Sequence, residues 1–327
     1  MEEKLKVLFV SSGNSKKFEI APFIKAQGES LVNGGVEVTY FSISGKGFIG
    51  YLKDSFRLRK YLKNSKIDII HAHYSLSGWT AVLSFPNLPI VLSLMGSDTY
   101  GAFIDVNKIS FRSYALVILT KLIQPFVDVI ICKSRHIESY VYLKKKSHVI
   151  PNGVLLSDFS TNISVSASDL GLSLNKKHVL FLGSKTDVRK NYILADKAVK
   201  LLGKGNINLL APYPVKHEEV VKLLKVVDCL VVPSFMEGSP NVVKEAMACN
   251  CPVVATDVGD IQWLFGNTPG YFIADFSSDD VAKKITEALA FVEKFGRTNG
   301  RERLIELGLD SREIAHRLIN IYSKILE

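Results

Sequence analysis

The sequence of 327 residues contains few cysteines and no metal-binding pattern. The four cysteines are Cys132, Cys229, Cys249 and Cys251, and the closest pair has one residue between its members. A zinc pair has a gap of about two to four residues. The seven histidines form neither an H-x3-H nor an H-E-x-x-H pattern. We therefore expect buried free thiols in a reducing compartment, and no metal site.

Long apolar runs are also absent. None reaches the ~18 residues that a membrane-spanning helix needs. The apolar stretch 7–10 is too short for a signal peptide and follows two glutamates. We expect a first β-strand there and a cytoplasmic protein, which argues against a periplasmic binding protein. The missing G-x-G-x-x-G fingerprint argues against a dehydrogenase.

Acidic residues are scarce in the first half of the chain. Residues 1–155 contain 20 Lys and Arg but 11 Asp and Glu, a net charge of +9, whereas residues 156–327 contain 21 of each kind. This excess predicts an anionic partner for the first half. A membrane face or a phosphorylated acceptor is favoured, and we expect no nucleic acid.

Short apolar runs alternate with longer amphipathic stretches in two series. The predicted strands of the first series are 6–10, 37–42, 67–71, 90–94, 129–132 and 148–150, and those of the second are 178–182, 207–210, 229–233, 252–256 and 271–273. Strands that alternate with helices indicate parallel sheets built from βαβ units. We predict two doubly wound domains, 1–155 and 156–310, and a terminal helix, 311–327, that packs back on the first domain.

The segment 233–248, Pro-Ser-Phe-Met-Glu-Gly-Ser-Pro-Asn-Val-Val-Lys-Glu-Ala-Met-Ala, follows a predicted strand. Ser239 is expected to cap a helix that has Pro240 at its first position. The amides of Gly238, Ser239, Asn241 and Val242 would then meet the positive end of the helix dipole. Such a helix start is a site for an anion.

Two carboxylates flank this predicted anion site. Glu237 lies just before the helix, and Glu245 lies two turns inside it. The first is expected to face a ligand beside the anion, and the second to reach a hydroxyl on the same ligand. The diphosphate, sugar and ribose of a nucleotide sugar match this arrangement. An ordinary strand–helix turn with surface acids is the alternative.

The loop 181–191, Phe-Leu-Gly-Ser-Lys-Thr-Asp-Val-Arg-Lys-Asn, follows the first strand of the second domain. Lys185, Arg189 and Lys190 lie within six residues of one another. Cations at a strand end are placed to neutralise a diphosphate. A solvated basic loop is the alternative.

Three strand-end loops of the first domain are further candidates. The loop 10–15 contains Gly13 and Asn14 and is expected to pass near a donor phosphate or an acceptor. His73 and the histidine two residues before it point to the same side of a strand. Met95 and Asp98 end the next strand. His73, Met95 and Asp98 are the acceptor-side candidates.

Together these segments resemble the retaining glycosyltransferases of the sucrose-synthase and glycogen-synthase-like family, also called glycosyltransferase family four or glycosyl transferases group one. The resemblance rests on Glu237-x7-Glu245 and extends through residues 251–259, 149–154 and 68–73. The opening Ser-Ser-Gly-Asn and the loop 183–191 are most similar to the polysaccharide-assembly members. The resemblance implies a GT-B fold, in which two Rossmann-like domains face a central cleft.

The resemblance also implies roles for single residues. Glu237 would contact the donor sugar near the reacting carbon, and Lys190 would bind the diphosphate. Glu245 would bind the ribose, Tyr213 would stack on the base, and the amides of 238–242 would hold sugar and diphosphate. Ser184 stands where the family often has arginine, so Lys185 or Arg189 would supply that charge.

The implied reaction transfers a sugar from a nucleotide donor to a glycan or lipid-linked acceptor of cell-surface polysaccharide synthesis. No cofactor and no metal are implied, because protein cations stabilise the departing diphosphate. Met95 stands where the family often has histidine. This departure and Ser184 keep a binding protein without catalysis open as an alternative. A nucleotide-sugar epimerase or phosphorylase of the same fold is the enzyme alternative.

Residues 50–65 read as a helix with a basic side. At about 100° per residue, Lys53, Arg57 and Lys60 form one stripe, with Leu52 and Phe56 within the basic side. A basic face that carries apolar residues is typical of helices on anionic membranes. We predict a peripheral protein on the inner face of the membrane. A solvated amphipathic helix is the alternative.

Overall fold

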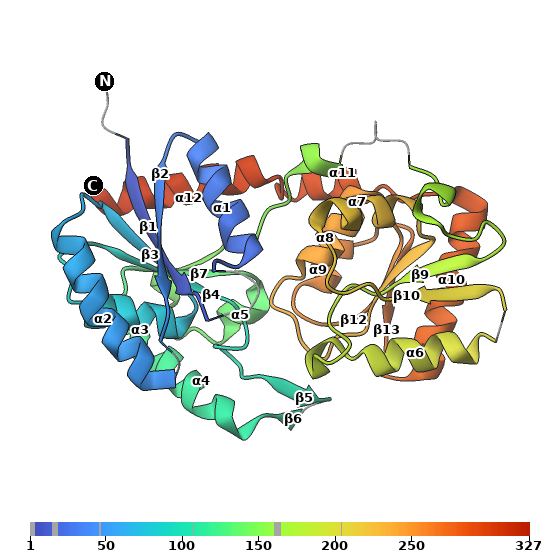
Figure 1. The fold of residues 1–327 in the computed structure, drawn as a ribbon, viewed down its shortest axis with the longest axis horizontal. Coiled ribbons are helices and arrows are strands. Elements are labelled where there is room, and N and C mark those ends of the chain that lie inside the picture. The colour runs from blue at the N-terminus through green and yellow to red at the C-terminus, as the bar shows by residue number, and fades with distance from the viewer. Residues whose placement is uncertain (1–3, 15–18, 46, 107, 160–164, 204) are drawn as a thin grey trace. The chain divides into compact units, whose positions relative to one another are not determined.

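The computed structural model describes residues 4–14, 19–45, 47–106, 108–159, 165–203 and 205–327. The chain forms two compact α/β units (Figure 1). Unit 1 comprises Met1–Ala102, Ser110–Gly153 and Ser311–Glu327. Unit 2 comprises Phe103–Ile109 and Val154–Asp310.

Unit 1 contains a parallel sheet with the strand order β2-β1-β3-β4-β7-β8. The strands are β1 (Lys6–Ser12), β2 (Glu37–Ile43), β3 (Ile69–His73), β4 (Ile90–Leu94), β7 (Val129–Cys132) and β8 (Ser147–Val149). Every residue of β3, β4 and β7 is buried. This burial is expected for central parallel strands that helices cover on both faces.

The helices of unit 1 divide between the two faces of its sheet. On one face, α1 (Pro22–Asn33) contacts α12 (Ser311–Leu326). On the other, α3 (Ser75–Leu83) contacts both α2 (Gly47–Lys63) and α4 (Phe111–Ile123). Right-handed crossovers place α2, α3 and α4 together, because the chain moves across the sheet in one direction from β2 to β7. The short helix α5 (Arg135–Ser139) precedes β8.

Unit 2 contains a second parallel sheet, with the order β10-β9-β11-β12-β13. The strands are β9 (Lys177–Leu180), β10 (Ile207–Leu210), β11 (Cys229–Val232), β12 (Val253–Thr256) and β13 (Tyr271–Ala274). The helices are α6 (Tyr192–Leu201), α7 (His217–Val226), α8 (Asn241–Ala248), α9 (Ile261–Phe265), α10 (Ser278–Phe295) and α11 (Gly300–Glu306). The core between the sheet, α6 and α10 includes Val179, Ala198, Val231 and Ile285.

The prediction of two doubly wound units is confirmed. One element was not predicted: an antiparallel hairpin of β5 (Phe103–Asp105) and β6 (Lys108–Ile109), which belongs to unit 2. All four cysteines are buried and free. Among the described residues, no helix has the length and apolarity needed to span a bilayer.

Helix α2 contains the predicted basic stripe, but one member of that stripe has another role. Arg57 forms an ion pair with Asp54 (Nη1–Oδ1 3.0 Å) and donates to Ser44 Oγ (2.6 Å). Its guanidinium also lies 4.6 Å from the ring centroid of Phe41. Arg57 is exposed, as the predicted stripe requires, and it also ties α2 to β2 and the loop after it.

Candidate functional site

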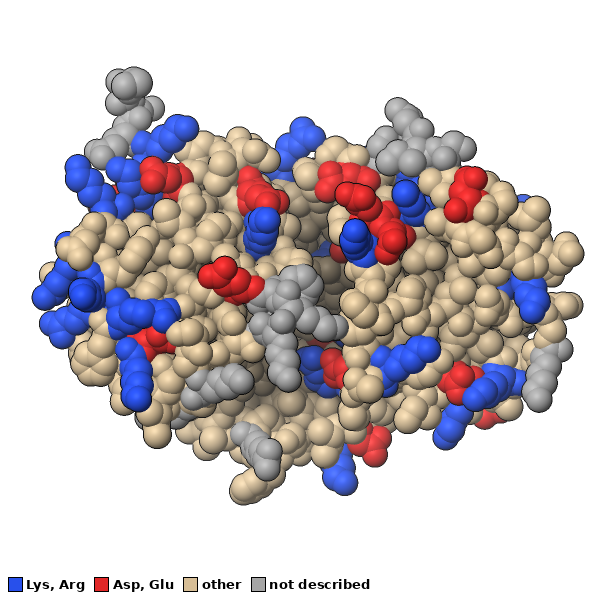
Figure 2. Space-filling model, viewed as in Figure 1, with Lys and Arg blue, Asp and Glu red and all other residues tan. Residues whose placement is uncertain are grey.

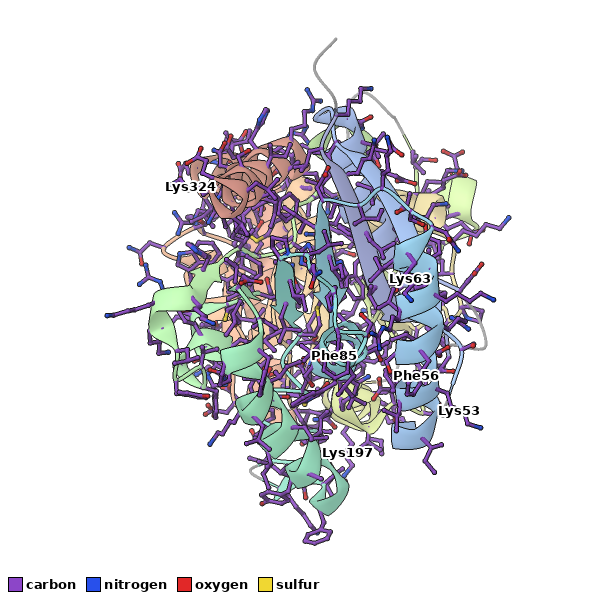
Figure 3. All side chains as sticks on the ribbon, turned by 90° about the vertical axis from the view of Figure 1, so that its left-hand side faces the viewer. Lys53, Phe56, Lys63, Phe85, Lys197 and Lys324 are labelled. Atoms are coloured by element: carbon purple, nitrogen blue, oxygen red, sulfur yellow. The ribbon has the colours of Figure 1, made fainter. Side chains whose placement is uncertain are left out.

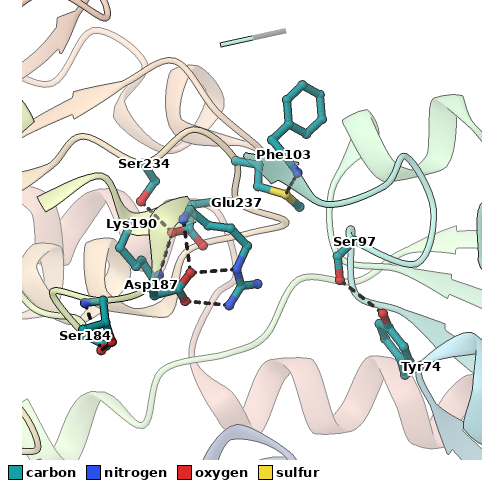
Figure 4. A network of polar contacts seen from close by, with 11 residues as sticks. Tyr74, Ser97, Phe103, Ser184, Asp187, Lys190, Ser234 and Glu237 are labelled. Atoms are coloured by element: carbon teal, nitrogen blue, oxygen red, sulfur yellow. Dashed lines mark hydrogen bonds and ion pairs between the residues drawn. The ribbon is translucent and has the colours of Figure 1, made fainter. Parts of the chain in front are cut away.

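Unit 2 brings the loop after β9 and the segment before α8 into contact. The Nζ of Lys190 lies 2.6 Å from Glu237 Oε1, and Ser234 Oγ donates to the same oxygen at 2.8 Å (Figure 4). The amide of Phe235 donates to Arg189 O at 2.8 Å. Because both segments follow strands of one parallel sheet, the contact lies at the carboxyl edge, where such sheets bind ligands.

The backbone around Lys190 fixes the direction of its side chain. Lys190 ends the 3-10 helix η5 (Val188–Lys190), which Asp187 caps by accepting from the amide of Arg189 at 3.1 Å. A Cβ at Gly183 would lie 3.2 Å from Lys190 Cγ. The small residue at 183 therefore lets the lysine stem lie against the end of β9 and reach Glu237.

The other two cations of the loop have different neighbours. Arg189 forms two hydrogen bonds with Asp187, at 3.1 and 2.7 Å. The ammonium of Lys185 lies 4.9 Å from the ring centroid of Tyr192. Lys190 pairs with Glu237, and the diphosphate roles of Lys185, Arg189 and Lys190 remain predictions.

Helix α8 begins one residue later than predicted. Its N-cap is Pro240 and its first residue is Asn241. The helical hydrogen bonds to Pro240 O come from Val243 and Lys244. The first amides of a helix are not used by its own ladder, so those of Asn241 and Val242 lie at the positive end of the dipole. The predicted helix start is thus present, without a serine cap, and anion binding there remains a prediction.

Ser239 instead joins a buried polar cluster below this helix start. Its hydroxyl donates to Asp260 Oδ2 at 2.6 Å and accepts from Lys244 Nζ at 3.0 Å. Burial lowers the pKa of Lys244 to about 8, although the negative charges of Asp260 and Glu245 act to raise it. Burial also raises the pKa of Asp260 to about 6, although the positive charge of Lys244 and the hydrogen bond from Ser239 act to lower it.

A glycine brings the loop before α9 against this cluster. Gly259 has a positive φ of 66°, and a Cβ there would lie 2.7 Å from Glu237 O and 2.9 Å from Gly238 O. The adjacent Asp260 can therefore reach Ser239. Sequence reasoning missed this Ser239–Lys244–Asp260 cluster. The sequence signal that could have revealed this cluster is Lys244, which lies among apolar residues on the buried side of α8.

Glu245 and Tyr213 are the predicted ribose and base contacts. Glu245 lies on α8 and is half-buried, and burial raises its pKa, while the charges of His217 and Lys244 oppose the rise. Tyr213 follows β10 and exposes about half of its surface. Both belong to unit 2, and their roles remain predictions.

Replacing Glu245 with alanine is expected to weaken binding of a nucleoside diphosphate. A hydrogen bond to a charged group contributes ~1.5–3 kcal/mol, which corresponds to roughly a ten- to hundredfold rise in Kd. Titration calorimetry measures this change, and a thermal melt of the same variant checks its folding. An unchanged Kd in a folded variant would remove Glu245 from the binding site.

In unit 1, the predicted donor residues Gly13 and Asn14 follow β1. Asn14 Nδ2 donates to Gly45 O at 2.7 Å, and the amide of Gly13 donates to Ile43 O at 2.8 Å. A Cβ at Gly13 would lie 2.1 Å from Ser42 Oγ. These contacts hold the loop closely against the end of β2. A direct donor contact of either residue remains a prediction.

His73 is buried beneath the end of β3. Its ring stacks on His71 with centroids 4.4 Å apart. Neither ring nitrogen of His73 has a hydrogen-bond partner among the described residues. Burial and the charges of His71 and Lys133 lower its pKa well below the usual value. His73 is therefore neutral near pH 7, and its acceptor role remains a prediction.

Asp98 organises the loop after β4. Its carboxylate accepts from the amides of Met95, Gly96 and Ser75, each at 3.0 Å. The side chain is fully buried. Burial raises its pKa to about 6, although the hydrogen bonds from these amides act to lower it. Asp98 thus fixes the position of Met95, which is half-buried. The acceptor-side roles of both residues remain predictions.

The described residues contain no cluster of three or more His, Cys, Asp or Glu side chains suited to a metal. Lys190, beside Glu237, and the start of α8 lie at the carboxyl edge of the unit 2 sheet. Two doubly wound parallel-sheet units are the architecture of the GT-B class.

Two family profiles match this chain. "Glycosyltransferase Family 4" matches residues 3–158, and "Glycosyl transferases group 1" matches residues 172–290. Together they account for most of both units, and the chain belongs to this glycosyltransferase family.

Two curated relatives are similar to much of this chain. TuaC of Bacillus subtilis, a glycosyltransferase named for teichuronic acid biosynthesis, is 30% identical over 247 residues, which cover 67% of this chain and 60% of TuaC. N,N'-diacetylbacillosaminyl-diphospho-undecaprenol alpha-1,3-N-acetylgalactosaminyltransferase of Campylobacter jejuni is 24% identical over 314 residues, 84% of this chain and 82% of the relative.

Solved structures agree on the fold. Sucrose-phosphate synthase of Thermosynechococcus elongatus aligns with a TM-score of 0.83 at 18% identity, covering 99% of both chains. HepE of Anabaena, solved in complex with UDP and glucose, aligns with a TM-score of 0.70 at 16% identity, covering 98% of this chain and 100% of HepE.

Proposed function

We propose that this protein transfers a sugar from a nucleotide-sugar donor to a glycan or lipid-linked acceptor, with retention of configuration, in cell-surface polysaccharide synthesis. The observation that carries the proposal is the Lys190–Glu237 pair beside the first amides of α8. The relatives named for teichuronic acid and for an undecaprenol-linked acceptor support the choice of acceptor. The UDP in the HepE structure supports a nucleotide donor.

In the proposed mechanism the sugar–phosphate bond loosens first, and positive charge develops at the anomeric carbon. Lys190 and the α8 amides stabilise the departing diphosphate, with Lys185 or Arg189 adding charge. The acceptor hydroxyl attacks on the face that the leaving group vacates, and a phosphate oxygen takes its proton. Glu237 lies beside the reacting sugar. No dedicated protein base is needed.

The proposal is tested by a donor-hydrolysis screen over common nucleotide sugars, followed by mass spectrometry of acceptor products. Transfer to a lipid-linked or glycan acceptor with the donor's anomeric configuration supports it. Release of an epimerised or phosphorylated sugar would replace the transferase with an epimerase or phosphorylase. Tight nucleotide binding without turnover of any donor would indicate a binding protein.

Activity is expected to survive removal of divalent cations, because protein cations take the charge role that a metal would otherwise have. Transfer rates measured with EDTA should match those measured with added magnesium. A complete loss that magnesium restores would contradict the metal-independent mechanism.

The proposed site of action is the inner face of a membrane. Lysine and arginine side chains gather over α2 at the edge of unit 1 (Figure 2). An anionic bilayer attracts such a surface, and a lipid-linked acceptor would be presented there.

A further inference from the structure

Helix α4 is apolar on the side that faces solvent. Phe111, Tyr114, Ile118 and Leu122 follow one another at intervals of three or four residues and form one stripe. Phe111 is 86% exposed, Ile118 57% and Leu122 55%. The opposite side of the helix is buried through Ser113, Thr120 and Ile123. A contiguous exposed apolar patch marks a site of interaction with a protein, a membrane or a ligand, so this stripe requires a partner.

Cations border the end of this stripe. Lys146 Nζ donates to Val127 O at 2.7 Å and to Pro125 O at 3.2 Å, which holds Lys144–Lys146 beside the exposed ring of Phe126. Lys144 and Lys145 are exposed, and so is Lys121 on α4 itself. Two carboxylates in this part of the chain, Asp128 and Glu138, accept hydrogen bonds from Ile90 N and Ser147 Oγ.

Helix α2 has a matching outward surface on the same face of the sheet. Ile49, Leu52 and Phe56 are exposed along its first part, and Arg59, Lys60 and Lys63 along its last part. Helix α3 links the two: Trp79 Nε1 donates to Leu119 O at 3.0 Å, and Thr80 Oγ1 donates to Tyr51 O at 3.2 Å. Figure 3 shows Phe56 and Phe85 on this side, with Lys53 and Lys63 on α2.

We call the exposed side chains of α2 and α4 named above, together with Phe85, Phe126 and Lys144–Lys145, the apolar-basic face. The exposed residues that the structure describes on α2 and α4 include no carboxylate, since Asp54 of α2 is buried. A second copy docked through the same face would place lysines against lysines, which opposes association. An anionic bilayer accepts both parts, because apolar and aromatic side chains enter the head-group region and lysines meet the phosphates.

We propose that α4 inserts its apolar stripe into an anionic membrane while the cations of α2 and of Lys144–Lys145 hold the face against the lipid phosphates. This inference rests on the proposed function for its biological setting, since a lipid-linked acceptor lies in such a membrane. It differs from the sequence-based prediction in naming α4 as the inserting element.

Co-sedimentation of the full chain with vesicles tests the inference. The double variant Ile118→Ser/Leu122→Ser is compared with a matched control, Leu201→Ser/Ile305→Ser, in unit 2. The control side chains are 55% and 58% exposed, as the α4 pair is. The wild type and the control are expected to bind phosphatidylglycerol vesicles at low salt and not phosphatidylcholine vesicles. The α4 variant is expected to lose at least about tenfold in partitioning.

Two further variants separate the contributions of charge and insertion. Lys60→Glu/Lys63→Glu is expected to abolish binding to the anionic vesicles. A tryptophan at the stripe, Phe111→Trp, is expected to shift its emission to the blue when those vesicles are added. Donor hydrolysis is expected to persist in all these variants, because none of the substituted residues belongs to the predicted donor site.

Three outcomes would overturn the inference. They are a wild type that does not bind the anionic vesicles, an α4 variant that binds as the wild type does, and a wild-type dimer that the α4 variant dissolves without any vesicle binding. The last outcome would show that the stripe is an interface between two copies of the chain. Failure of the proposed function is distinguishable, because it appears as absent transfer with vesicle binding intact.

Discussion

Replacing Lys190 with alanine is expected to lower the turnover number by ~10²–10³, by analogy with removal of one oxyanion donor. The ammonium lies 2.6 Å from Glu237 at the carboxyl edge of the unit 2 sheet. Negative charge on a departing diphosphate grows as the bond to the sugar breaks, so the cation acts more strongly on the transition state than on the bound donor. The Michaelis constant is therefore expected to change much less than the turnover number.

Initial rates over a range of donor concentrations measure both constants. Lys185→Ala is the matched control, since it removes a lysine from the same loop whose ammonium lies over Tyr192. It should lose far less activity. A Lys190→Ala enzyme with a near-normal rate, together with an inactive Lys185 or Arg189 variant, would transfer the diphosphate role to that residue.

Replacing Lys244 with methionine is expected to lower the free energy of unfolding by about 3–5 kcal/mol at neutral pH. The substitution leaves Asp260, which is buried, without the cation that lowers its pKa. A buried carboxylate that has lost its cation must take up a proton or remain charged in an apolar setting, and both oppose folding. Denaturant titrations of variant and wild type measure the difference.

The same cluster predicts how this loss depends on pH. In the variant, the folded-state pKa of Asp260 rises further above its unfolded value, so stability is retained in acid and is lost as pH rises through the folded-state pKa. The deficit relative to the wild type should widen from pH 5 to pH 8. The double variant Lys244→Met/Asp260→Asn should recover much of the stability and lose this pH dependence. A double variant as unstable as Lys244→Met alone would refute the pairing.

The sequence predicted both sheets because each buried strand is a short apolar run next to a turn. It placed Lys190, Glu237 and the α8 amides near one another because the carboxyl ends of parallel strands share an edge. The serine cap was wrong because the Ser239 hydroxyl bonds to Asp260, 21 residues away. No local pattern encodes that partner.

Two surface features could not be predicted from the sequence, because they too depend on which parts of the chain come into contact in the fold. The apolar residues of α4 lie on both sides of the helix, and periodicity alone does not tell which side the sheet covers. Arg57 has the spacing of an outward cation and is exposed, but helical spacing does not reveal its contact with the ring of Phe41. The hairpin of β5 and β6 is too short to show an alternating pattern.

Helix α12 has a consequence for the order of folding during synthesis. Tyr322 is fully buried in unit 1, and its hydroxyl lies 2.6 Å from His71 Nδ1. Arg317 also donates to Val149 O at 2.8 Å. Yet α12 follows the whole of Val154–Asp310 in the chain. At typical elongation rates, roughly 10–30 seconds separate the first part of unit 1 from its last helix. Throughout that interval the nascent sheet exposes the apolar surface that α12 will cover, so unit 1 is the part of the chain that most needs chaperone protection.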